Sequence, residues 1–306
     1  MKHRTRWLPL VALLLMAHDG SPPQPHDVWE SWNWHPVVVF GLFLPLAVYS
    51  RGLLHLWQRR GVGQVVSVWH AAAFLGGILG LFVALVSPLD ALSEALFSAH
   101  MIQHILIIFV ASPLIIVSRP LPTLLRGLPN ALRRFVHRIE QKMRVNSGWK
   151  FLTHPLVVWI IHTSAWWLWH LPVLYEAALT SEPIHVMEHS SFLGTSLLYW
   201  WYIFQAVDAQ AGHYGVRILS LFTMSLQGGL LGALITFSRT PWYRIYSASV
   251  ESWGISLLED QQLAGILMWI PAGFVYLIVI LFVMMRWLNA IEPRSASLGP
   301  SHSETS

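Results

Sequence analysis

The chain has 306 residues, a formal net charge of +4 and a markedly apolar composition, with 55% hydrophobic and only 11% charged residues. With a mean hydropathy of +0.52, this composition excludes an ordinary soluble protein and indicates one that crosses a membrane several times. The chain contains no cysteine, which excludes disulfides, thiolate metal sites and cysteine nucleophiles. Any bound metal must therefore be held by histidine, methionine or carboxylate side chains.

The first 20 residues resemble a targeting segment. Lys2, Arg4 and Arg6 precede an apolar run from Trp7 to Ala17, and a polar, proline-rich stretch follows at 18–27. A positive start, a short apolar middle and an abrupt polar exit are typical of a signal peptide, although the cleavage pattern is poor. We expect residues 1–20 to be a signal peptide, with an additional helix as the alternative.

Seven longer apolar segments follow, each sufficient for a helix that crosses a bilayer core of about 30 Å. The fold class predicted is therefore all-α, a polytopic membrane helical bundle. We expect a seven-helix membrane domain over 32–290 and a polar cytoplasmic tail over 291–306. The spans are predicted near 35–57, 65–86, 96–117, 154–174, 185–207, 215–237 and 262–287.

The distribution of charge predicts the orientation of these spans. The link between the third and fourth spans has a single acid, Glu140, against eight basic residues: Arg119, Arg126, Arg133, Arg134, Arg138, Lys142, Arg144 and Lys150. Basic loops stay in the cytoplasm, so we expect the mature N-terminus outside and the C-terminus inside. The loosely amphipathic stretch from Leu124 to Met143 is expected to lie as a helix on the inner membrane surface, in contact with anionic lipid rather than nucleic acid.

Two histidine pairs lie at the outer ends of predicted spans. His100 and His104 are four residues apart, as are His185 and His189, so each pair projects from one face of a helix and can close on one metal ion. Unpartnered polar groups in lipid are costly and tend to mark function. We therefore predict a metal site formed by these four histidines.

Other residues at the same depth are possible additional ligands or groups that orient a ligand. Glu188 suits the orienting role, and Asp260 either complements a helix dipole or bonds to an imidazole. His35 and His170 precede or neighbour prolines and are alternatively interfacial caps. The full set of these additional candidates is His170, His35, Asp260, Glu188, Asp90, Met101 and Met187.

The ligand types narrow the choice of metal. Imidazole suits copper, zinc and iron, and thioether adds a preference for Cu(I). Met101 and Met187 lie inside the histidine motifs, although filling core space is their simpler interpretation. We favour copper over zinc; a haem is disfavoured because His100 and His104 are only one turn apart.

An ordered set of motifs resembles the seven-span CtaG-type cytochrome c oxidase assembly factors of bacteria. The resemblance covers residues 32 to 290 and rests on Ser87-Pro-Leu-Asp90, His100-Met-Ile-Gln-His104, Trp169-His-Leu-Pro172 with Tyr175, His185-Val-Met-Glu-His189, and Asp260-Gln-Gln-Leu-Ala-Gly265 with Met268-Trp269. It implies an accessory protein of the bacterial inner membrane that helps to build a haem-copper oxidase. The implied partner is an oxidase subunit that carries a copper centre.

We therefore predict a non-enzymatic factor that binds copper on the outer side and delivers it. Two alternatives stay open. His185-Val-Met-Glu-His189 matches the H-x-x-E-H pattern of a zinc enzyme, in which the glutamate is the general base. A scaffold for oxidase assembly would need no metal at all.

Overall fold

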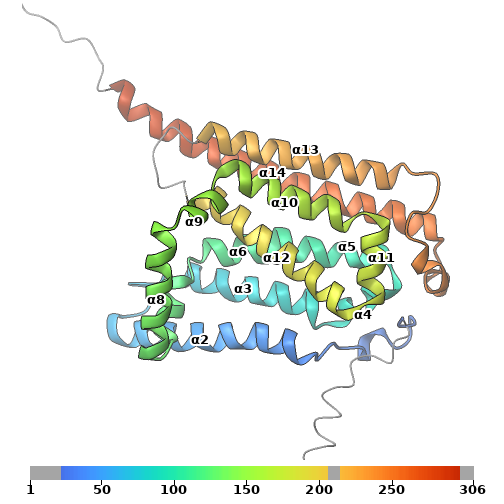
Figure 1. Ribbon diagram of the computed structural model, residues 1–306, viewed down its shortest axis with the longest axis horizontal. Coiled ribbons are helices and arrows are strands. Elements are labelled where there is room, and N and C mark those ends of the chain that lie inside the picture. The colour runs from blue at the N-terminus through green and yellow to red at the C-terminus, as the bar shows by residue number, and fades with distance from the viewer. Residues whose placement is uncertain (1–21, 206–213, 297–306) are drawn as a thin grey trace, which may run out of the picture.

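The computed structural model describes residues 22–205 and 214–296, and within these ranges it is helical with no strand. The predicted signal segment and the end of the predicted tail lie outside the described residues. Most long helices run side by side along one axis (Figure 1). The elements are η1 (Val28–Glu30), α2 (Pro36–Arg60), α3 (Val68–Leu85), α4 (Pro88–Ala95), α5 (Phe97–Ile105), η2 (Leu106–Ala111), α6 (Ser112–Val117), α7 (Leu121–Gly127), α8 (Asn130–Val145), α9 (Ser147–Leu152), α10 (Pro155–Trp169), α11 (Pro172–Thr180), α12 (Glu182–Gln205), α13 (Tyr214–Thr236), η5 (Arg244–Ala248), η6 (Val250–Trp253) and α14 (Leu257–Ala296).

Each predicted span falls on one or more helices, but the number of spans is confirmed only in part. Among the described residues, five helical stretches are long and apolar enough to cross a membrane, namely α2, α3, α5 through α6, α13 and α14. The pair α10 and α11 makes a sixth if it is counted as one broken span. Helix α12 falls short because its first two turns hold Glu182, His185, Glu188 and His189. The chain is a multi-pass membrane protein in either case.

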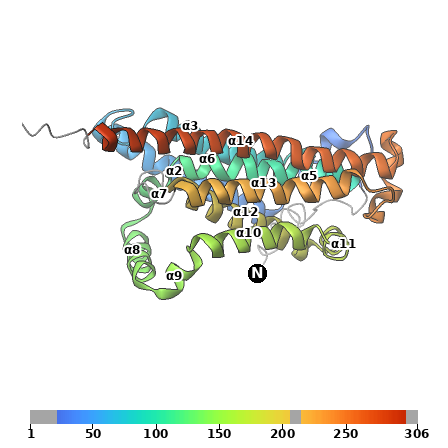
Figure 2. The ribbon, with the colours of Figure 1, turned by 90° about the horizontal axis from the view of Figure 1, so that it is seen from above.

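The span predicted at 154–174 is bent rather than continuous. Helix α10 ends at Trp169, and α11 begins at Pro172 in a direction 74° away. Proline has no N–H to continue a helix and disfavours a helical residue before it, and Leu171 is accordingly extended. The bend turns α11 across the direction of α10 (Figure 1), so that α11 is seen nearly end-on where α10 is seen lengthwise (Figure 2).

The third span contains a π-helical segment, η2, immediately after the turn that carries His104. Pro113 provides a physical reason, since its ring cannot fit into an uninterrupted α-helix. The N–H of Ser112 donates to Ile107 O, five residues earlier, and Pro113 has no N–H for the carbonyl of Ile108. The indole Nε1 of Trp200 on α12 supplies that donor at 2.7 Å.

The basic segment is split into three helices, whereas the sequence predicted one amphipathic helix from Leu124 to Met143. Helix α7 packs on α2, where Gly52 and Gly127 let the backbones touch. A Cβ on either glycine would collide with a carbonyl oxygen, that of Thr123 or of Val48. Helix α8 lies across the end of the bundle, with apolar and basic side chains both exposed (Figure 1).

The two ends of the bundle differ in chemistry. The start of α2, the end of α3, α4, α11 and the starts of α5, α12 and α14 gather at one end, which we call the histidine end (Figure 1). Helices α7, α8 and α9 lie at the opposite end, which we call the basic end (Figure 2). The helical elements thus place all the predicted site residues at a common end.

Candidate metal centre

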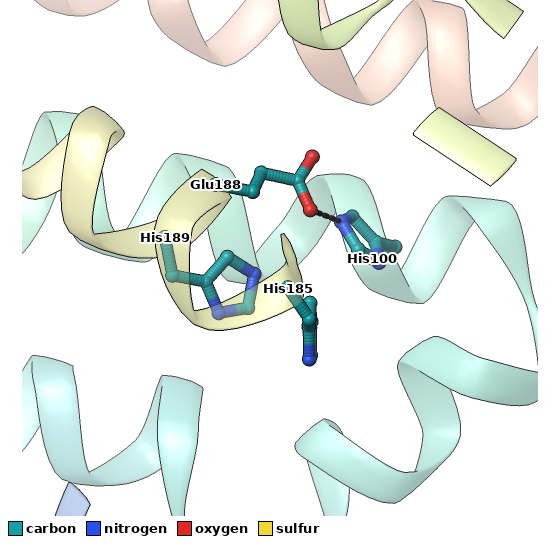
Figure 3. A group of neighbouring side chains, drawn as sticks. All are labelled: His100, His185, Glu188 and His189. Atoms are coloured by element: carbon teal, nitrogen blue, oxygen red, sulfur yellow. Dashed lines mark ion pairs between the residues drawn. The ribbon is translucent and has the colours of Figure 1, made fainter. Parts of the chain in front are cut away.

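Four side chains from two helices converge at the histidine end (Figure 3). His100 on α5 and His185, Glu188 and His189 on α12 each present one ligand atom, and these four atoms all lie within 4.8 Å of one another. His100 and Glu188 are fully buried and His189 nearly so. Glu188 Oε2 lies 3.5 Å from His100 Nε2.

The helices hold these side chains through their periodicity and their ends. On α12, residues at i, i+3 and i+4 share a face, which groups His185, Glu188 and His189. His100 lies in the first turns of α5, and the start of that helix is fixed by Asp260 of α14. The carboxylate of Asp260 accepts hydrogen bonds from the backbone N–H groups of Phe97 at 2.7 Å and Ser98 at 3.2 Å.

His104 lies beside this group rather than within it. Its Nε2 is 3.0 Å from His100 Nε2 and 3.6 Å from Glu188 Oε1, and the two imidazole rings are nearly perpendicular. His170 is next to His104, with ring centroids 5.9 Å apart. The Nδ1 of His170 donates to the carbonyl of Trp166 at 2.6 Å, which leaves its Nε2 lone pair available.

The buried polar atoms of this group suit a metal ion. The Nε2 atoms of His170, His185 and His189 and both carboxylate oxygens of Glu188 have no hydrogen-bond partner within the described part of the chain. Buried polar groups are almost always paired, because an unpaired one costs about 1–3 kcal/mol. A set of imidazole nitrogens with a carboxylate is a donor set for copper, zinc or iron, and the residues therefore fit such an ion.

The other predicted candidates are not at the centre of the group. Asp260 is fully buried and contacts the start of α5, so it complements the dipole of a neighbouring helix. His35 pairs with Glu182, at 3.0 Å. Asp90 accepts hydrogen bonds from Asn33 at 2.6 Å and Gln103 at 2.8 Å, and thereby connects α4 to α5.

The two methionines are also not placed as ligands. Met101 is buried in the hydrophobic core, and the side chain of Met187 is 56% exposed. Successive helical residues are about 100° apart, so Met187 is turned about 200° from His185 and points away from the histidines. The buried position of Met101 agrees with its simpler interpretation as a residue that fills core space, and the four converging ligand atoms are nitrogen and oxygen.

Sequence reasoning missed several residues that support the histidines. Gln103 donates to both Asp90 and the carbonyl of Ala84 and so fixes α5 against α3. Tyr243 donates to the carbonyl of His170 at 2.7 Å, and burial raises the pKa of this phenol, so it stays a donor at neutral pH. In the sequence, Gln103 lies between the predicted ligands His100 and His104, and its polar side chain was the feature from which a supporting role could have been predicted.

A known protein family matches most of this chain. The model of the family described as cytochrome c oxidase caa3 assembly factor (Caa3_CtaG) matches residues 47–290. The chain belongs to the Caa3_CtaG family. The resemblance found in the sequence motifs is thereby confirmed.

Two curated relatives of this Caa3_CtaG protein come from mycobacteria. They are the "Uncharacterized protein Mb0105" of Mycobacterium bovis and the "Uncharacterized protein MT0111" of Mycobacterium tuberculosis, and each is 24% identical over 296 residues. The match covers 93% of this chain but only 43% of each relative, so the chain spans less than half the length of these proteins. No solved structure matches the chain.

Proposed function

We propose that this protein binds copper at the histidine end of its bundle and delivers it to an oxidase subunit during assembly of a haem-copper cytochrome c oxidase. Membership of the caa3 assembly factor family supports the oxidase as the destination. The same description supports a non-enzymatic role.

One observation carries the copper assignment. Three imidazoles and the carboxylate of Glu188 converge from α5 and α12, in a buried place that leaves most of their polar atoms without another partner among the described residues. Ligation by nitrogen and oxygen, without thiolate, suits a factor that must release its ion. His104 and His170 lie close enough to bind the ion when one of the four ligands dissociates from it.

The membrane arrangement belongs to the same proposal. Counting α12 and the bent pair α10 and α11 as one span each gives seven spans, with the basic end in the cytoplasm by the positive-inside rule. The histidine end then faces the periplasm of a bacterial inner membrane, with the mature N-terminus outside and the C-terminus inside. Helix α8 would lie on the inner leaflet with its basic side chains at anionic headgroups.

The test is the metal content of the purified protein in detergent after loading with Cu(I), Cu(II) or Zn(II), measured by elemental mass spectrometry. We expect about one copper per chain in the wild type, and none above background in a His100→Ala/His189→Ala variant. His55→Ala/His137→Ala, which changes two histidines far from the site at the basic end, is the matched control. Equal copper in all three proteins would overturn the assignment.

A zinc enzyme is the second candidate, and a specific observation favours it. Both oxygens of Glu188 are buried beside three imidazoles without a hydrogen-bond partner in the described chain, as a general base would require. A Glu188→Gln variant that keeps its metal but loses oxidase assembly would support this candidate. Full function without any bound metal would instead support the metal-free scaffold.

A further inference from the structure

A cavity of about 270 Å³ lies between α2, α3 and α12 at the histidine end. Its wall includes His185 and His189 of the metal centre, and it extends to His35 and Glu182 at the starts of α2 and α12. Most of the remaining wall is aliphatic, from residues such as Leu42 and Leu81. The cavity therefore connects the buried centre with a partly exposed pair of polar side chains.

That pair has the chemistry of a cation site. His35 Nε2 lies 3.0 Å from Glu182 Oε1, and the exposed fractions of the two side chains are 26% and 62%. The Nδ1 of His35 is buried and has no hydrogen-bond partner in the described ranges. An imidazole and a carboxylate from different helices thus meet at the solvent side of the cavity.

The position of His35 is fixed by a chain of hydrogen bonds. The backbone N–H of His35 donates to Asn33 Oδ1 at 2.9 Å, and Asn33 Nδ2 donates to Asp90 Oδ2 at 2.6 Å. Asp90 in turn accepts from Gln103, which lies between His100 and His104 on α5. The exposed pair and the metal centre are therefore held in one hydrogen-bonded frame.

The register of α12 arranges three polar side chains along the cavity. Glu182, His185 and His189 are separated by three and four residues, so they lie on one face of the helix, about one turn of 5.4 Å apart. All three line the cavity, and the Nε2 atoms of His185 and His189 have no hydrogen-bond partner in the described part of the chain. Oxygen and nitrogen donor atoms thus follow one another along the cavity from Glu182 to His189.

We propose that the cavity is the access route of the metal centre and that His35 and Glu182 form a transient cation site at its mouth. This inference rests on the copper-binding function proposed above and adds the path that the ion follows. A transient site on the path changes the rate of exchange, whereas the affinity at equilibrium is set by the buried ligands. Loss of the pair should therefore slow loading and leave the final copper content unchanged.

The first experiment measures the time course of Cu(I) binding to metal-free protein, with rapid removal of free ion and elemental mass spectrometry. We expect His35→Ala/Glu182→Gln to load at least ten-fold more slowly than the wild type and to reach the same copper content. His26→Ala/Glu30→Gln is the matched control, because it removes an exposed histidine and an exposed glutamate that do not line the cavity.

The second experiment closes the cavity without changing a ligand. Gly41 lines the cavity, and a Cβ placed on it would meet no atom within 4 Å, so a side chain can begin there without a clash and Gly41→Trp is chosen to block the cavity. Gly273 on α14 is equally open but does not line the cavity, which makes Gly273→Trp the control. We expect slow loading in the first variant and normal loading in the second.

The outcomes separate the two proposals. Wild-type protein that takes up no copper overturns the proposed function and the route together. Wild-type protein that binds copper, with unchanged loading rates in both the His35→Ala/Glu182→Gln and Gly41→Trp variants, overturns the route alone. Variants that load slowly but also hold less copper at equilibrium would make His35 and Glu182 part of the centre, which likewise contradicts a transient site.

Discussion

The Nε2 atoms of His100 and His104 lie 3.0 Å apart in the buried interior of the bundle. At this distance the N–H of one ring donates to the lone pair of the other, so neither of these two nitrogens can bind an ion while the contact persists. His100 belongs to the converging group of four, and His104 does not. The two histidines of this motif therefore have different expected roles.

The first prediction follows from this difference. Replacing His100 with Ala should abolish copper binding, whereas His104→Gln should weaken it by about 10–100-fold, as for residues that orient a ligand. Titration of each purified variant with Cu(I) against a competing chelator measures both affinities. Equal loss in the two variants would show that His104 is a direct ligand.

The second prediction concerns stability. An ion that binds only the folded protein stabilises it by about 2.7 kcal/mol at a free concentration of about 100 times Kd. Copper should therefore raise the Tm of the wild type in detergent, by about 5 °C or more. The Tm of His100→Ala/His189→Ala should not respond to copper. A similar rise in both proteins would mean that the stabilising ion binds elsewhere.

The third prediction concerns the start of α5. The two carboxylate oxygens of Asp260 accept hydrogen bonds from the N–H groups of Phe97 and Ser98. Asp260→Asn leaves only one side-chain oxygen to accept them. Hydrogen bonds to charged groups contribute about 1.5–3 kcal/mol each, so the Tm should fall, and copper affinity should fall with it because His100 loses its fixed position. Calorimetry and copper titration give the two values.

Glu259→Gln is the control for this variant, since it makes the same chemical change at the neighbouring exposed residue. It should retain wild-type copper affinity. If Asp260→Asn also retained it, the contact between α14 and α5 would have no part in positioning the centre.

The fourth prediction tests the π segment. Trp200→Phe keeps the aromatic volume but removes the donor to Ile108 O, leaving a buried carbonyl without its partner at a cost of about 1–3 kcal/mol. We expect a lower Tm than in Trp201→Phe, which changes the adjacent, partly buried tryptophan. Identical melting of the two variants would argue that Ile108 O finds another donor.

Hydropathy and helical periodicity predicted much of this molecule. The length of each apolar run predicted helices such as α3 and α13 close to their observed bounds, because span length is set by the bilayer. The convergence of His100 with His185 and His189 followed from equal spacing and from alternating span direction. The outward position of Met187 was also available from the helical period, which was not applied to it.

Other features depend on contacts between distant parts of the chain. Asp260 meets Ser98 across 162 positions of sequence, and no local pattern predicts which helix start it serves. The bend after Trp169 was suggested by Pro172, but its 74° angle depends on how α11 packs. To predict the close approach of α7 to α2, one would have had to recognise that Gly52 and Gly127 lie where the two helices touch.

The π segment also determines where the histidines point. A turn closed by bonds between residues five apart holds one residue more than an α-turn, so everything before η2 is rotated by about 100° relative to an uninterrupted helix. The third span is therefore two helices with different phases, and both contact α12: the first through His100, and the second through the hydroxyl of Ser112, which lies 2.7 Å from that of Ser196. The direction of the His100 side chain thus depends on the number of residues between these two positions as well as on their identities.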